Sequence, residues 1–355
     1  MKNKFIKIFV LFFSFFSFLF ISFFIVLTIY FNNYSNTKIS ISSDTIIEIN
    51  YGSSLKRVTE ILYKNNLIDN QEKFYWYLRL ARPDSKNIQA GYYIFSNDIS
   101  YAQLVSSLLN GRSEVFKITF KEGQTLKDLT KTLSNANLAL KEDVEAFLVS
   151  DNLFSKINPP IKLIEIAKKD GIGGIEGYLL PETYFFGKND SLEKIILTMN
   201  KSLMSKLDAQ ILAEMSRQNM SLHDLLTLAS IVEKETADPK ERPLIANVYL
   251  TRLKKGMRLQ ADPTVIYGIK NYMGKITKKD LLTPHAYNTY TNKGLPLGPI
   301  SSVSIEAIKA VLWPSESDYL FFVSKNDGTH IFCPDLKCHN KAVKEWQIDF
   351  FKKNR

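Results

Sequence analysis

Leu228-Ala229-Ser230-Ile231-Val232-Glu233-Lys234-Glu235-Thr236 places two carboxylates at the end of a strongly apolar run of residues. The run begins at residue 222, has the apolar periodicity of a helix, and stops before the break at Asp238-Pro239. A carboxyl group among aliphatic neighbours keeps its proton to higher pH, because burial disfavours the charged form. A protonated carboxyl can donate to a glycosidic oxygen before its bond breaks. The stretch therefore predicts a core helix that carries a candidate acid.

The helical periodicity does not decide which carboxylate would be the acid. Glu233 and Glu235 both lie toward the edges of the apolar arc of this helix. The ordinary alternative is that both are half-exposed and pair with Lys234, Lys240 or Arg242, as is usual for a glutamate on a helix.

The N-terminal residues predict a membrane anchor. Residues 8–31 carry no charge and would form a helix long enough to cross a hydrocarbon core of roughly 30 Å. A cleaved signal peptide is the alternative, but its apolar core is usually only about 7–15 residues and ends at a small-x-small site, which is missing here. Three lysines precede the span, and Lys38 is the one basic residue in the ten that follow it. The positive-inside rule then leaves residues 1–7 in the cytoplasm and exports the body of the chain.

Composition excludes some classes of protein. With 45% hydrophobic and 23% charged residues among 355, the chain has enough apolar material for one large domain or two modest ones and is not disordered. The net charge of +10 could serve an anionic membrane surface or a polyanionic substrate, although a compositional bias toward lysine explains it more simply. No basic run interleaved with aromatics predicts nucleic-acid binding.

The rest of the chain predicts an α+β fold in several parts. Residues 32–43 are polar and predict a tether. A strand, a glycine turn, a Ser or Thr cap and an amphipathic helix occur in that order twice, from residue 47 and again from residue 118. Residues 44–118 therefore predict a small LysM-like α+β module, and residues 119–355 a larger helix-rich domain with a β-hairpin. The elements expected within these parts are helices over 71–81, 101–109, 192–218, 222–236, 239–255 and 337–352, a strand over 89–95, and hairpin strands over 319–323 and 329–333.

The two cysteines, Cys333 and Cys338, are open to two interpretations. An exported domain can join them in a disulfide. With His330 and His339 they could also form a zinc site, but all four ligands would come from one ten-residue segment. No metal or cofactor is expected.

Four further segments carry a family resemblance. They are Glu176-Gly177-Tyr178-Leu179-Leu180-Pro181-Glu182-Thr183-Tyr184, the stretch 258–268, Tyr287-Asn288-Thr289-Tyr290, and the stretch 294–300. With the glutamate helix and the anchor, they resemble the endolytic peptidoglycan transglycosylases of the MltG or YceG-like family. The resemblance identifies Glu235, in its Glu-Lys-Glu-Thr context, as the catalytic acid. The two cysteines are not part of that pattern, which argues against both the zinc site and the disulfide.

The resemblance also suggests residues around the acid. Asp262 precedes Pro263, so it is expected to cap a helix, with a place in the site as the alternative. Glu176 is expected either in the cleft or fastening loops. The complete set of candidate substrate-binding residues is Glu176, Tyr184, Gln260, Asp262, Tyr287, Asn288 and Tyr290.

The resemblance implies a lyase anchored by a single pass in the bacterial cytoplasmic membrane. It would cleave the bond between N-acetylmuramic acid and N-acetylglucosamine in nascent peptidoglycan, leave 1,6-anhydro ends, and so terminate strand elongation. The glycan strands and the cytoplasmic membrane are the expected partners, together with peptidoglycan synthases (penicillin-binding proteins). Two alternatives stay open: a muramidase that uses water, and a non-catalytic scaffold that binds peptidoglycan.

Overall fold

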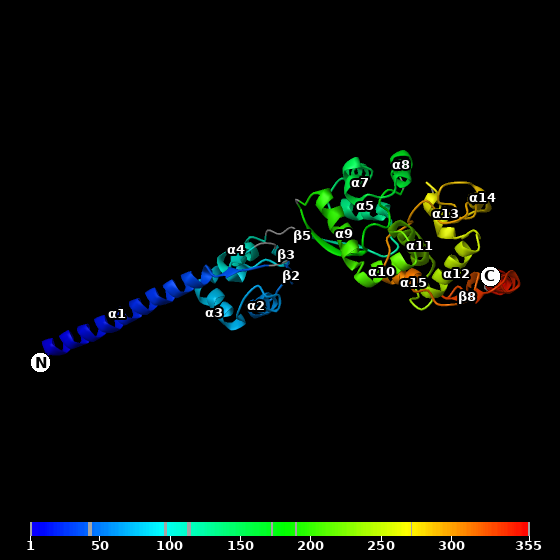
Figure 1. Cartoon of the computed structure of the whole chain (residues 1–355). Helices are drawn as coiled ribbons and strands as arrows, with labels where there is room; N and C mark the ends of the chain where they lie inside the picture. The colour runs from blue at the N-terminus through cyan, green and yellow to red at the C-terminus, as the bar shows by residue number, and fades with distance from the viewer. Residues whose placement is uncertain are drawn as a thin grey trace. The chain divides into compact units, whose positions relative to one another are not determined.

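The computed structural model describes residues 2–41, 45–95, 98–111, 115–171, 173–188, 190–270 and 272–353. The fold is mixed and rich in helices, and the strands of the described residues pair in four two-stranded sheets (Figure 1). The chain divides into two compact units. Unit 1 consists of residues 1–116 and 185–188, and unit 2 of residues 117–184 and 189–355.

Unit 1 is a long helix followed by a small α+β module. Its elements are α1 (Lys2–Ser35), β1 (Lys38–Ile39), β2 (Thr45–Ile49), α2 (Leu55–Lys64), α3 (Gln71–Ala81), the 3-10 helix η1 (Pro83–Asn87), β3 (Gly91–Phe95), β4 (Ile99–Ser100) and α4 (Tyr101–Asn110). Strand β2 pairs antiparallel with β3, and β1 with β4. Ser54 caps α2 by accepting a hydrogen bond from the backbone of Arg57. Gly111 ends α4 in the left-handed conformation, at a φ of 60°.

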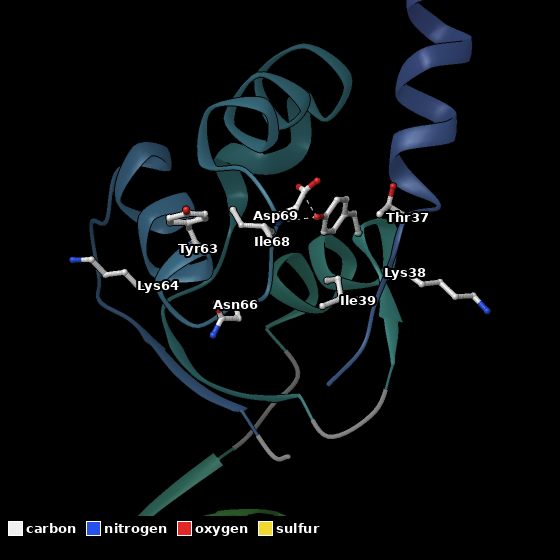
Figure 2. Close-up of a pocket in the computed structure, with 9 residues that line it drawn as sticks. Thr37, Lys38, Ile39, Tyr63, Lys64, Asn66, Ile68 and Asp69 are labelled. Carbon is white, nitrogen blue, oxygen red and sulfur yellow. Dashed lines mark hydrogen bonds between the residues drawn. The ribbon is translucent and has the colours of Figure 1, made fainter. Parts of the chain in front are cut away.

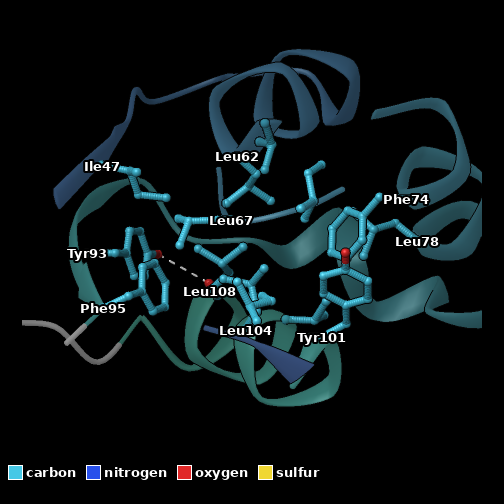
Figure 3. Packing of buried hydrophobic residues seen from close by; sticks show 14 of the residues in the cluster. Ile47, Leu62, Leu67, Phe74, Leu78, Tyr93, Phe95, Tyr101, Leu104 and Leu108 are labelled. Atoms are coloured by element: carbon cyan, nitrogen blue, oxygen red, sulfur yellow. Dashed lines mark hydrogen bonds between the residues drawn. The ribbon is translucent and has the colours of Figure 1, made fainter. Parts of the chain in front are cut away.

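The helices and strands of the module share one apolar core (Figure 3). Leu62 of α2, Phe74 and Leu78 of α3, and Leu104 of α4 are fully buried in it. Tyr93 of β3 closes one side, where its hydroxyl donates to the carbonyl of Leu108 at 3.2 Å. Alternation along β2 and amphipathic periodicity along the helices therefore turn one face of each element inward.

The helix α1 continues into this core, which corrects the predicted tether over residues 32–43. Helical structure extends to Ser35, and Lys38–Ile39 forms a strand; residues 42 and 43 lie outside the described residues. Tyr34 is 6% exposed, packs against the rings of Tyr77 and Tyr101, and donates to Asp69 at 3.2 Å. An aromatic side chain with this much apolar surface gains more from burial than from solvation in a polar segment.

Within the described residues, the stretch of α1 that is long and apolar enough to cross a membrane is Phe15–Ser35, with a mean hydropathy of 2.1. It overlaps the predicted span over residues 8–31 and ends four residues later. The charge-free residues therefore do form one continuous helix.

From β5 onward the chain is mostly helical. Its elements are β5 (Val115–Phe120), α5 (Leu126–Asn135), α6 (Lys141–Leu148), α7 (Asp151–Ile157), α8 (Ile161–Asp170), β6 (Glu182–Gly187), α9 (Leu192–Lys206), α10 (Ala209–Arg217), α11 (Leu222–Glu235), α12 (Arg242–Lys254), α13 (Asp262–Gly268), α14 (Lys278–Leu282), α15 (Ile305–Leu312), β7 (Phe321–Ser324), β8 (His330–Cys333), α16 (Leu336–Val343), the π-helix η2 (Lys344–Asp349) and α17 (Phe350–Lys353). The single helix predicted over 192–218 is wrong: it is two helices, because Asp208 caps α10 by accepting from the backbone of Ile211.

Helix α11 is the central helix of unit 2. Its side chains from Leu225 to Val232 are all buried, and it packs against α12, α13 and α15. Ser230, in the middle of this run, accepts a hydrogen bond from the backbone of Ile300 at 3.0 Å. The buried hydroxyl thus fixes the loop before α15 against α11, since it would otherwise be desolvated without a partner there.

A disulfide joins Cys333 and Cys338, contrary to the argument drawn from the family pattern. It links the end of β8 to α16, close to the paired strands β7 and β8. Both sulfurs are consumed by this bond, so the alternative of a zinc site at these cysteines is wrong.

Core truncation in unit 1 should destabilise that unit. Leu62→Ala leaves a cavity among fully buried side chains, so we expect the free energy of opening of α2 and α4 to fall by about 2–5 kcal/mol. Amide hydrogen exchange of the whole protein measures this. Tyr51→Ala, at a residue that is 98% exposed, is the control and should change it by less than about 0.5 kcal/mol. Equal effects of both variants would contradict the assigned core.

Candidate functional site

Glu235 is the last residue of α11, where the buried helix leaves the core. The next residue, Thr236, is extended at a φ of −144°, so the chain turns away directly after the carboxyl group. A helix C-terminus exposes carbonyl oxygens that disfavour a nearby anion. The position alone therefore favours the protonated form of this side chain.

The carboxyl group of Glu235 has one hydrogen-bond donor from the neighbouring helix. The Tyr249 hydroxyl of α12 donates to Oε1 at 2.6 Å. Burial raises the pKa of Glu235 from 4.5 to about 7, and the negative charge of Asp262 adds to this. The Tyr249 hydrogen bond and the positive charge of Arg252 act in the opposite direction. The result is an acid poised near neutral pH.

Arg252 lies one helical turn beyond Tyr249 and is held in place. It is 7% exposed, and its guanidinium donates to the carbonyls of Leu259 at 2.6 Å and Leu320 at 2.7 Å. Its fixed charge lies close enough to influence the pKa values of Glu235 and Tyr249.

Glu233 has a different environment. Its carboxylate forms an ion pair with Arg242 at 2.9 Å and accepts hydrogen bonds from the backbone and hydroxyl of Ser304. The predicted pairing with Arg242 therefore applies to this residue, although the carboxylate is only 4% exposed. Buried in this way, Glu233 links α11 to the starts of α12 and α15, and both of its oxygens are occupied.

An open cleft of about 560 Å³ lies at this end of α11. Glu235 and Thr236 line it together with Lys234, Arg242 and residues near the start of α15. A second hollow of about 470 Å³ shares Glu122, Ser304 and Glu306 with the first. Both are lined by residues of unit 2, and Glu235 is a lining residue of the first.

Asp262 and Tyr290 lie near Glu235, and Gln260 precedes Asp262 by two residues. The Tyr290 hydroxyl donates to Asp262 at 2.6 Å. The charge of Asp262 adds to burial in raising the pKa of Glu235. Burial raises the pKa of Tyr290, and the charges of Asp262 and Glu235 add to this. Asp262 is the first residue of α13 and the cap is Ala261, so the expected helix-capping role of Asp262 is wrong. Gln260 is exposed at a φ of 52°, and its backbone N–H donates to the carbonyl of Thr289.

Glu176 and Tyr287 belong to a second, enclosed cluster. Glu176 is 2% exposed; its carboxylate accepts from the Tyr267 hydroxyl at 3.1 Å and from the backbone of Leu126 at the start of α5. Burial raises its pKa to about 8. Tyr287 is 1% exposed and stacks edge-on against Tyr267. Glu176 is expected either to lie in the cleft or to fasten loops, and this buried placement fits the second role.

Asn288 and Tyr184 hold the protein's own backbone. The Asn288 amide nitrogen donates to three carbonyls, including that of Thr283 at 2.7 Å, and its oxygen accepts from two backbone amides. The Tyr184 hydroxyl donates to the carbonyl of Leu180 at 2.8 Å. Both side chains are buried, so the structure gives no support to direct substrate contact.

Tyr249, Arg252 and the Glu233–Arg242 pair were not predicted as parts of a site. The signal available in the sequence was a Tyr and an Arg three residues apart on a predicted helix. That spacing places them on one face of the helix, but the sequence does not show which element packs against that face.

Unit 1 contains a hollow of about 620 Å³ near the end of α1 (Figure 2). Asp69 is its acidic residue, and it accepts hydrogen bonds from Tyr101 at 2.7 Å and from Tyr34. Although burial opposes ionisation, these bonds keep its pKa below the usual value. The carboxyl group of this hollow therefore favours its ionised form, unlike that of Glu235. No group of three His, Cys, Asp or Glu side chains that could hold a metal ion is found among the described residues.

Comparisons with known proteins agree with one another. A sequence model described as the YceG-like family matches residues 47–345. A Bacillus subtilis protein named endolytic murein transglycosylase is 34% identical over 311 residues, which is 86% of each chain. A Streptococcus pneumoniae protein of that name is 29% identical over 315 residues, 83% of this chain and 57% of the relative. A crystal structure of a yceG-like protein from Listeria monocytogenes matches with a TM-score of 0.59 at 34% identity, covering 85% of this chain and 99% of that one.

Glu176 should make stability depend on pH. Its pKa of about 8 exceeds the ordinary 4.5, so the folded state keeps a proton that the unfolded state loses. Its contribution to stability is complete below pH 4.5 and falls by up to about 1.4 kcal/mol per pH unit until about pH 8. Glu176→Gln should flatten this decline in chemical denaturation series, whereas Glu142→Gln on the exposed side of α6 should leave it unchanged. An unchanged decline in Glu176→Gln would contradict this assignment.

Proposed function

Because this chain belongs to the YceG-like family, we propose that it is a lytic transglycosylase that cuts peptidoglycan glycan strands at Glu235. The observation that carries the proposal is the Glu235 carboxyl group, whose pKa of about 7 leaves it largely protonated below neutral pH and which belongs to a residue that lines the cleft. The relatives named endolytic murein transglycosylases support the substrate class.

In the proposed reaction Glu235 acts first as acid and then as base. Protonated Glu235 donates to the oxygen that joins N-acetylmuramic acid to N-acetylglucosamine, and the bond to the muramic anomeric carbon breaks. The muramic C6 hydroxyl attacks that carbon, and the Glu235 carboxylate takes the hydroxyl proton. The products are a 1,6-anhydro end and a free 4-hydroxyl. An intramolecular hydroxyl has a high effective concentration, so no second carboxylate is needed to activate water.

Tyr249 and Arg252 support both stages. Tyr249 occupies Oε1, so Oε2 is the oxygen available for proton transfer. Its hydrogen bond and the Arg252 charge stabilise the carboxylate that forms after donation, while burial favours the acid before it. The two opposing effects keep the cost of either protonation state low.

The predicted substrate-binding residues divide by their accessibility. We propose that Asp262, Tyr290 and Gln260 bind the sugar, because Asp262 and Gln260 are exposed and the half-buried Tyr290 is bonded to Asp262. Glu176, Tyr184, Tyr287 and Asn288 shape the loops behind it, because their side chains are buried.

The proposal includes the place of cleavage. Residues 8–31 of α1 would anchor the chain by one pass in the cytoplasmic membrane, with residues 1–7 inside and the chain that follows the anchor outside. Residues 44–118 would act as a LysM-like module that holds glycan, and residues 119–355 as the catalytic domain. Anchored there, the enzyme would cut nascent strands internally, limit their length, and work beside the synthases that polymerise them.

Replacing the acid should abolish cleavage. With full-length detergent-solubilised protein and purified peptidoglycan, Glu235→Gln should lower the rate by about 10²–10⁴-fold, because the amide cannot donate the proton. Glu306→Gln, in the same cleft, is the matched control and should keep the rate. Mass spectrometry should find 1,6-anhydromuramic ends, one water lighter than reducing ends.

The products separate the alternatives. Reducing ends in place of anhydro ends would make the protein a muramidase. Glycan binding without cleavage by the unmodified protein would favour the scaffold. Full activity of Glu235→Gln would refute Glu235 as the acid.

The rate should also report the pKa of Glu235. Donation needs the protonated form, so kcat/KM should fall as the pH rises through about 7. Tyr249→Phe removes a hydrogen bond that favours the carboxylate, so the fall should move to higher pH. Tyr319→Phe is the control and should leave the profile in place. A shift to lower pH in Tyr249→Phe would contradict the assigned role of the hydroxyl.

A further inference from the structure

Helix α3 has an exposed face of mixed aromatic, apolar and basic character. Lys73, Trp76, Arg79 and Leu80 share this side, which we name the α3 face, and Glu72 lies between Trp76 and Arg79 on it. Trp76 is 53% and Leu80 57% exposed, whereas the opposite side of the helix is buried in the core of unit 1. Two large exposed side chains on one short helix indicate a contact surface.

The α3 face lies beside the end of the apolar helix α1 (Figure 1). The Lys73 ammonium is 5.9 Å from the ring centre of Tyr30 and 4.4 Å from that of Tyr34. Both tyrosines are within the apolar stretch that ends at Ser35. Tyr30 is five residues from that end, or about 7 Å along the helix, which is close to the thickness of one headgroup layer.

Within unit 1, direct packing holds the end of α1 against α3. Tyr34 is buried against Tyr77 of α3, and its hydroxyl is bonded to Asp69. A bilayer crossed by α1 would therefore meet α3 at a fixed depth. Tryptophan prefers that depth, and lysine and arginine bind lipid phosphates there.

We propose that the α3 face docks on the outer leaflet of the membrane that α1 crosses, with Trp76 and Leu80 in the interface and Lys73 and Arg79 on lipid phosphates. This rests on the membrane anchor of the proposed function. The occupant is the phospholipid surface, because the face adjoins the membrane-crossing stretch and carries two cations against the single carboxylate of Glu72.

Depth-dependent fluorescence quenching tests the docking. Full-length protein with Trp313→Phe and Trp346→Phe keeps Trp76 as its single tryptophan and is reconstituted in phospholipid vesicles. A nitroxide near the lipid headgroup should remove about half or more of its emission, and a nitroxide near the chain end clearly less. Lys73→Glu with Arg79→Glu should weaken the shallow quenching. The control moves the single tryptophan to the exposed Tyr51 position, by Trp76→Phe and Tyr51→Trp, and should show little quenching.

A tryptophan placed inside α1 separates the two proposals. If Phe20→Trp, as the single tryptophan, is quenched by the deep label while Trp76 is not quenched, the anchor stands and the docking is refuted. If Phe20→Trp is not quenched, the anchor fails and the docking falls with it. Equal quenching at Trp76 and Tyr51→Trp would mean unspecific adsorption, and emission that depends on protein copies per vesicle would mean a second chain; both refute the docking.

Discussion

The hydrogen bond from Tyr249 to Glu235 joins α12 to the end of α11, and the chemistry of the candidate site depends on it. α11 is buried along most of its length, which brings its terminal carboxyl group to the edge of the core with little water around it. An unpaired carboxylate there would be costly. The Tyr249 hydroxyl and the Arg252 guanidinium reduce that cost without removing it. The pKa of Glu235 therefore stays near 7, above its ordinary 4.5. The Glu233–Arg242 pair secures the end of this helix and the Ser230 contact its middle, so the position of the acid is fixed.

Glu176 shows that a raised pKa does not identify an acid catalyst by itself. Burial shifts both carboxyl groups in the same direction, and each accepts a tyrosine hydrogen bond. Glu176 also binds the first backbone amide of α5 and is 2% exposed, so a sugar cannot reach it. Glu235 lines a cleft. Glu176 and Glu235 therefore differ in their access to the cleft and not in the direction of their pKa shifts. The sequence alone does not show which side chain a cleft reaches.

Local patterns predicted the bounds of several helices and failed where distant contacts or a cap inside a polar stretch decide. The helix predicted over 71–81 is confirmed at both ends, and α11 differs from its prediction by one residue, because caps and periodicity are properties of neighbouring residues. The break at Asp208 was missed because a capping aspartate resembles any polar residue of a helix. Asn288 is predicted to bind the sugar, yet its amide nitrogen donates to backbone carbonyls five to eight residues away. The family pattern argues against the disulfide, but it carries no information on the geometry of two cysteines that it does not contain.

The same limit explains the tether. A segment rich in Asn and Ser predicts flexible chain, but one aromatic residue within it reverses the outcome. Tyr34 packs in the core with Tyr77 and Tyr101, and burial of its ring opposes the entropic cost of ordering the polar residues around it. The helix therefore passes directly into the module, and the module takes its orientation from the helix. A membrane segment joined in this way determines which surface of the adjoining domain faces the lipid, whereas a flexible linker would leave that choice to diffusion.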